Sequence, residues 1–202
     1  MELIPFTQEH ARQVAEVHIE GQTGTFLTEL GLDFLTALYA AMAISPWCFG
    51  FVLLDGETVA GVGVAALDTQ QLFREVKRQH WPRLALPVVR QVIRRPALIA
   101  RIIDNFRYPL KLAAPPGEAE VLFIGLRRTY MRHGLGPQLL DRLLDAAHRR
   151  GCGSATAIID RRNRAIRWTI ATLPGVHVVH EIEMNGRTML VYRVKLPLGA
   201  EG

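Results

Sequence analysis

The chain has 202 residues, of which 49% are apolar and 21% are charged, and its formal net charge is +5. This composition excludes a disordered or fibrous protein and predicts one globular domain with a sizeable core. Two cysteines, Cys48 and Cys152, lie far apart in the sequence. Their number and spacing exclude a disulfide framework and a cysteine metal site, and favour a reducing, cytoplasmic location. No basic leader follows Met1, so we expect no secretory signal.

The first part of the chain has the pattern of a strand, two helices and a hairpin. Residues 2–6 read as a short strand, and apolar residues at helical spacing follow it twice. Two apolar runs then flank Asp55 and Gly56, a pair that is typical of tight hairpin turns. The second run contains Gly61 and Gly63, which indicate a bulge or the close approach of another backbone.

One uncharged run, from Phe34 to Leu54, is long enough to cross a bilayer. It contains Pro46 and Gly50, which are typical of a break between two elements. We therefore interpret the run as a buried helix followed by a buried strand, and predict no integral membrane segment.

Residues 70–118 differ in character from the rest of the chain. We expect short helical stretches separated by prolines, and a proline-rich linker over 113–117. The prolines are Pro82, Pro87, Pro96 and Pro109. Basic residues outnumber acidic ones here, which suggests either a solvated cap over a cleft or a surface for an acidic molecule. Such a molecule could be a nucleotide-sugar, an acyl carrier protein or anionic lipid headgroups; we prefer the cap. Aromatic residues are not interleaved with the arginines, so we expect no nucleic-acid binding.

The most informative stretch is 131–137, Met-Arg-His-Gly-Leu-Gly-Pro. It follows the apolar run 121–126 and precedes a run of helical spacing from Leu139 to Ala147. A strand, a glycine loop and a helix in this order expose backbone N–H groups at a helix N-terminus, which suits a phosphate or pyrophosphate. A dinucleotide-binding fingerprint is excluded, because Leu139 stands at the third glycine position.

The C-terminal part continues with a strand over 154–159, a helix over 163–172 and a hairpin over 176–196. His177 and His180 are three residues apart and should face opposite sides of a strand unless the strand is bulged. We therefore predict no metal site.

The element order predicts an α/β (α+β) fold in a single domain over residues 1–202. The sheet is expected to be mixed and mostly antiparallel, with helices on both faces and a helical insertion at about 70–118. Apart from that insertion, the order and the glycine loop resemble the GNAT superfamily of acyl-CoA-dependent N-acyltransferases. The resemblance implies a splayed central pair of parallel strands that admits a thioester.

The resemblance also implies acetyl-CoA as the cofactor and assigns residues to it. Leu126 would bind the pantetheine through its backbone, and Asn163 would help to hold the pantetheine arm. The family's loop pattern, Gln or Arg, two residues, Gly, one residue, then Gly or Ala, would cradle the pyrophosphate. In this chain the loop residues are Met131, Arg132, His133, Gly134, Leu135, Gly136 and Pro137.

Three positions depart from the family pattern. Met131 replaces a polar residue, although the adjacent Arg132 could substitute for it, and Pro137 lacks an N–H. The family often places in the last helix a tyrosine that protonates the leaving thiolate. This chain has Thr169 or Ile170 at that place.

Acyl transfer to an amine needs a group that accepts the amine proton. Glu120, at the start of the central strand, and Asp160, at the end of its neighbour, are candidate bases, and Tyr192 is a candidate proton donor. Three alternatives stay open: Glu120 as a solvated strand-end carboxylate, Asp160 paired with Arg161, Arg162 or Arg164, and a water chain as the base.

These patterns predict an acyltransferase that moves an acetyl group from acetyl-CoA to the amine of a small molecule by direct attack. An acidic acceptor is a secondary hypothesis, and a homodimer is compatible with the sequence. Two alternatives are a catalytically silent sensor that binds CoA or another phosphate ligand, and a basic interaction module on anionic partners.

Overall fold

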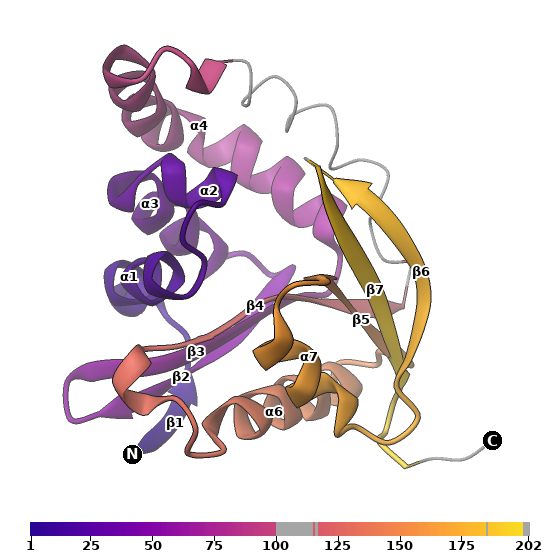
Figure 1. Ribbon diagram of the computed structural model, residues 1–202. Helices are drawn as coiled ribbons and strands as arrows, with labels where there is room; N and C mark the ends of the chain where they lie inside the picture. The colour runs from indigo at the N-terminus through magenta and orange to yellow at the C-terminus, as the bar shows by residue number, and fades with distance from the viewer. Residues whose placement is uncertain (100–114, 116, 185, 200–202) are drawn as a thin grey trace.

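The computed structural model describes residues 1–99, 115, 117–184 and 186–199. Within these residues, seven strands form one sheet in the order β1-β2-β3-β4-β5-β7-β6 (Figure 1). Only β4 and β5 pair in parallel; the other neighbours are antiparallel, which confirms the predicted mixed sheet. The strands are β1 (Glu2–Pro5), β2 (Cys48–Asp55), β3 (Thr58–Ala66), β4 (Glu118–Leu126), β5 (Ser154–Asp160), β6 (His177–Met184) and β7 (Arg187–Lys195).

Helices cover both faces of this sheet (Figure 1). On one face, Leu139 and Leu143 of α6 are fully buried against the strands, at the helical spacing that the sequence predicts. On the other face, Val14 of α1, Leu35 of α3 and Leu72 of α4 form a second core. The helices are α1 (Ala11–Gly21), α2 (Phe26–Glu29), α3 (Leu32–Met42), α4 (Thr69–Arg94), α6 (Leu135–Arg149) and α7 (Arg164–Ala171).

A glycine in β3 lets α6 lie directly on the sheet. A Cβ atom on Gly63 would lie 2.8 Å from Cδ1 of Leu143, closer than side-chain atoms ordinarily approach. The group that approaches Gly63 is therefore a helix side chain, and not the other backbone that the sequence predicted. This contact helps to fix the height of α6, and hence of its N-terminus, above the strands.

The uncharged run is divided between two elements, as predicted. Its first part forms α3, and its last part forms most of β2, whose residues are largely buried. Among the described residues, no helix combines the length and the apolar character needed to cross a bilayer.

The insertion differs from the prediction of short helical stretches. Residues Thr69–Arg94 form one 26-residue helix, α4, with Pro82 and Pro87 inside it. Each proline removes one N–H from the helical hydrogen bonding, but Leu84, between the two prolines, packs against the core. Tertiary packing therefore overrides the local signal of the prolines.

The second half of the insertion lies largely outside the described residues. This applies to most of the helical stretch expected between Pro96 and Pro109 and to most of the predicted linker over 113–117. Leu98 and Ile99 are described, and both are helical.

A buried histidine lies between α1 and the sheet. His18 is 4% exposed and its ring stacks on Phe123 of β4, with 4.3 Å between the ring centroids. Its Nδ1 is hydrogen-bonded to the Tyr39 hydroxyl at 2.6 Å, whereas Nε2 has no hydrogen-bond partner among the described residues. Burial lowers the pKa of His18 from 6.5 to about 4, because a protonated ring would place an unsatisfied charge in the core.

This depressed pKa predicts a dependence of stability on pH. The unfolded chain takes up a proton at His18 near pH 6.5, whereas the folded chain does so only near pH 4. The contribution of His18 to the free energy of unfolding is therefore fully present above pH 6.5 and is lost as the pH falls towards 4. The loss amounts to about 3 kcal/mol at 1.36 kcal/mol per pKa unit.

Urea unfolding of the wild type and of His18→Gln, measured from pH 7.5 to pH 4, checks this prediction. The variant has no titrating group at this position, so its stability should fall less steeply with pH. Equal slopes for the two proteins would contradict the assignment.

Candidate active site

The central strands β4 and β5 separate halfway along β4. Glu118–Val121 pair with Ser154–Ala157, and the pairing stops there, although β4 continues to Leu126 and β5 to Asp160. The diverging ends open a cavity of about 450 Å³ between them. The splay expected from the family resemblance is therefore present. Residues 21–27, the two strands, α7 and the β6–β7 hairpin form the cavity walls.

A bulge occurs in β4 at the point of separation. Val64 of β3 pairs with Phe123, and Ala65 pairs with Val121, so Leu122 has no partner in β3. Leu122 also lines the cavity. Because a bulge interrupts the ladder and leaves its extra residue unpaired, backbone N–H groups here can face the cavity. Such donors can stabilise negative charge that develops on a ligand oxygen.

The predicted glycine loop leads directly into α6. Arg132 and Gly134 have positive φ angles of 69° and 71°, and Gly134 is the N-cap residue of α6. No side chain caps this helix end, so its first-turn N–H groups have no partner within the helix. Pro137 stands at the third helical position and supplies no N–H. The uncapped helix end and the left-handed loop form a concave backbone site for an anion.

The loop, the end of β4 and α7 meet at Gly136. A Cβ atom on Gly136 would lie 3.7 Å from Oγ1 of Thr169 and 4.0 Å from Cδ1 of Leu126. The Thr169 hydroxyl donates to the Ala165 carbonyl at 3.2 Å, and Ile170 lines the cavity. The position at which the family often has a tyrosine thus carries a hydroxyl bound within its own helix and an apolar side chain.

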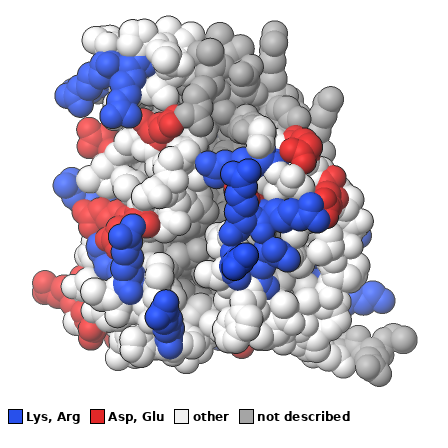
Figure 2. Space-filling view, in the orientation of Figure 1, with Lys and Arg blue, Asp and Glu red and all other residues white. Residues whose placement is uncertain are grey.

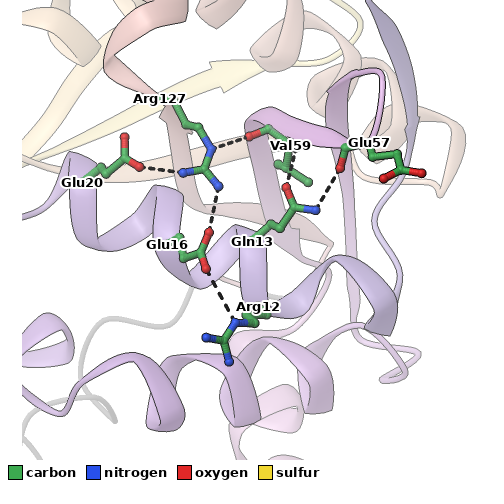
Figure 3. Close-up of polar contacts among 7 residues, drawn as sticks. All are labelled: Arg12, Gln13, Glu16, Glu20, Glu57, Val59 and Arg127. Carbon is green, nitrogen blue, oxygen red and sulfur yellow. Dashed lines mark hydrogen bonds and ion pairs between the residues drawn. The ribbon is translucent and has the colours of Figure 1, made fainter.

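Arg127 fixes the end of β4 to α1 (Figure 3). It donates from Nη1 to Glu20 at 2.7 Å, from Nη2 to Glu16 at 2.9 Å and from Nε to the Val59 carbonyl at 2.9 Å. Gln13 of the same helix accepts the Val59 N–H at 2.7 Å. Burial acts to lower the pKa of Arg127, but the hydrogen bonds and charges of the two carboxylates outweigh it and raise that pKa. The strand end that precedes the glycine loop is therefore held in place by charge.

The cavity wall brings together two of the predicted site residues, Asp160 and Asn163. Asp160 Oδ2 accepts a hydrogen bond from Arg187 Nη1 at 3.3 Å, and Arg187 Nη2 donates to the Gly24 carbonyl at 3.4 Å. Asn163 caps α7 by accepting the Ile166 N–H at 3.3 Å. The predicted alternative, Asp160 paired with an arginine, is observed, but the partner is Arg187.

Two other predicted residues, Glu120 and Tyr192, lie away from this cavity. Glu120 is buried rather than solvated, and it accepts a hydrogen bond from the Thr69 hydroxyl at 2.5 Å. The Tyr192 hydroxyl accepts a hydrogen bond from Arg167 Nε at 3.3 Å. Neither residue lines the cavity.

The two histidines of β6 correct another prediction. His177 pairs with Arg193 and His180 pairs with Val191, so the strand is bulged between Val178 and His180. The bulge places both histidines on the same face instead of opposite faces. Among the described residues, no group of three or more histidine, cysteine or acidic side chains is arranged to hold a metal ion.

Sequence reasoning missed Arg187 and the loop over 21–27 as parts of the wall. The loop is rich in glycine and threonine, but its contact with the sheet spans more than a hundred residues. Arg187 follows the Asn-Gly turn of the hairpin, and no local pattern indicates that it reaches Gly24.

Basic side chains flank this part of the molecule. Figure 2 shows Lys and Arg on both sides of the hollow in this face. Arg161, Arg162 and Arg164 are exposed between β5 and α7, and Arg132 is exposed in the glycine loop. Such a distribution favours the approach of an anionic ligand.

Comparisons with known proteins agree with this architecture. The family model described as "Acetyltransferase (GNAT) family" matches residues 20–169. A protein from Desulfovibrio desulfuricans described as an acetyltransferase of that family is 14% identical, with a TM-score of 0.61 over 96% of this chain and 99% of that one. An acetyltransferase from Salmonella typhimurium, solved with its cofactor acetyl-CoA, is 18% identical, with a TM-score of 0.61 over 100% and 97%. The ribosomal-protein-S18-alanine N-acetyltransferase of Escherichia coli is 12% identical, with a TM-score of 0.52 over 100% and 98%. No curated protein sequence matches the chain.

The glycine loop yields a prediction that a matched variant can test. Gly134 and Gly151 both have positive φ and open space around them, and they stand at opposite ends of α6. Leucine at either position should cost about 1–2 kcal/mol of stability, because the left-handed conformation disfavours a side chain. Only Gly134→Leu should also weaken CoA binding, by about tenfold or more, since its side chain holds a ligand away from the backbone. Calorimetric titration with CoA measures both variants, and equal affinities would count against the loop.

The Arg127 network yields a second prediction. Arg127→Met leaves Glu16 and Glu20 together without their shared cation and should destabilise the fold by about 2 kcal/mol or more. Arg128→Met removes the same charge from an exposed neighbour and should have little effect. Chemical denaturation compares the two variants. Equal stabilities would mean that the network does not hold the strand end.

Proposed function

The chain belongs to the GNAT acetyltransferase family, and on that premise we propose that it transfers an acetyl group from acetyl-CoA to the amine of a small molecule by direct attack. Two features support this proposal: the cavity between the diverging strands, and the uncapped N-terminus of α6, where Gly136 lies close to Thr169, the neighbour of the cavity residue Ile170. The cavity volume of about 450 Å³ lies within the range of small-molecule sites.

The residues of the loop fit the cofactor. Acetyl-CoA, when bound, supplies an acetyl group activated as a thioester. The backbone N–H groups from Arg132 to Gly136 would hold the pyrophosphate, with Arg132 and His133 adding side-chain donors and Met131 and Pro137 adding none. The backbone of Leu126 and the side chain of Asn163 would orient the pantetheine arm.

The wall of the cavity suggests how the acceptor amine is prepared. Asp160 is the carboxylate among the wall residues, so it is the leading candidate to accept the amine proton, directly or through water. Glu120 and Tyr192 stay candidates that would have to act through intervening groups. Arg187, which donates a hydrogen bond to Asp160, would hold the carboxylate in place in the wall of the cavity.

Direct attack is supported by the state of the two cysteines. Burial raises the pKa of Cys48 to about 12, and burial also raises the pKa of Cys152. Neither residue lines the cavity, so neither is suited to form an acyl-thioester intermediate. Both are free thiols, which agrees with a cytoplasmic location.

A second candidate function is a sensor that binds acetyl-CoA without turning it over. One observation favours it: Thr169 and Ile170, where the family often has a tyrosine, provide no acid for a leaving thiolate. The two functions differ in turnover and not in binding.

Thiol release from acetyl-CoA in the presence of a panel of small amines tests the proposal. We expect at least one amine to be acetylated, and expect Asp160→Asn to lower kcat about 100-fold while leaving the Kd of acetyl-CoA unchanged. Glu181→Gln, which removes an exposed carboxylate outside the cavity, is the matched control. Tight binding of acetyl-CoA with no turnover of any amine would favour the sensor, and absence of binding would remove both candidates.

A further inference from the structure

The outer half of α4 exposes a row of apolar side chains. Leu86, Val89 and Ile93 are 56%, 52% and 75% exposed. Their spacing of three and four residues places them on one face of the helix. We call these three residues the α4 stripe.

The α4 stripe lies on the side of the helix that faces away from the protein. Leu84, which partly packs against the core, is offset from Leu86 by two residues, or about 200° around the helix. Gln91 lies against Gly31 and is offset from Val89 by the same angle. Figure 1 shows the outer end of α4 at the edge of the molecule, away from the sheet. The α4 stripe is therefore not part of the core.

On α4 itself, the charges beside the α4 stripe are all positive. Arg83, Arg90 and Arg94 lie along its border, and all three are exposed. Glu75 is the only carboxylate on α4; it lies in the other half of the helix and accepts a hydrogen bond from Ser45 at 2.7 Å. Figure 2 shows basic side chains gathered over the outer end of this helix.

We propose that this face of α4 docks on the surface of an anionic lipid bilayer. A helix that carries an apolar row bordered by arginines can insert the row at the headgroup boundary while the guanidinium groups bind lipid phosphates. A second copy of the chain is a poorer partner, because it would bring two arginine borders together. A purely ionic partner would bind the arginines and leave the apolar side chains exposed to water.

Vesicle flotation with the full chain tests this proposal. The vesicles contain phosphatidylcholine alone, or phosphatidylcholine with phosphatidylglycerol. We expect the protein to float only with the anionic vesicles, and expect added salt to weaken the binding. Arg90→Gln combined with Arg94→Gln should weaken it about tenfold or more, as should Val89→Ser combined with Ile93→Ser.

The matched control is Arg142→Gln combined with Arg149→Gln, which removes the same charge from the exposed side of α6. It should keep most of the binding, and CoA titration and circular dichroism verify that each variant is folded. Equal loss in the control would overturn the proposal, as would equal binding to neutral vesicles or unchanged binding of the Val89/Ile93 variant. Two further results would overturn the bilayer in favour of another partner. A dimer in light scattering that the Val89/Ile93 variant abolishes would indicate a second copy of the chain. Binding of soluble polyglutamate that this variant leaves intact would indicate a purely ionic partner.

Discussion

The separation of β4 from β5 is the constraint on which the site depends. Each strand is held on its outer side, β4 by β3 and β5 by β7, so the sheet stays continuous while its centre opens. The bulge at Leu122 coincides with the opening and adds twist there. Beyond it, Arg127 ties the free end of β4 to α1 with charged hydrogen bonds. The cavity is thus maintained by interactions at its margins, and its interior is left for a ligand.

The same margins set the position of the glycine loop. Arg127 directly precedes the turn Arg128–Tyr130 that leads into the loop, and Gly63 allows α6 to rest on β3. One end of the loop is therefore fixed by charge and the other by close packing. The polar wall opposite, formed by Asp160, Arg187 and the Gly24 carbonyl, connects the hairpin with the segment between α1 and α2.

Local patterns in the sequence predict much of the fold and part of the site. The leucine spacing of α6, the two hairpins and the glycine loop each depend on residues close together in the chain, and each is present in the structure. The bulges at Leu122 and near Val179 escape such reasoning, because they result from pairing with distant strands. The continuous α4 escapes it because the packing of Leu84 against the core, between the two prolines, outweighs their local effect. The contact of Arg187 with Gly24 joins opposite ends of the chain, and the placement of Glu120 beside Thr69 depends on where α4 begins.

The conformation of the glycine loop has a consequence for how this chain can vary. Two residues, Arg132 and Gly134, take the left-handed region, and in the proposed function the loop would recognise its ligand through backbone N–H groups. Backbone recognition makes few demands on side-chain identity, so Met131 and Pro137 can depart from the family pattern while the concave shape persists. Mutational tolerance should therefore be uneven along the loop: broad at Met131 and His133, and narrow at the two positions that set the path of the chain.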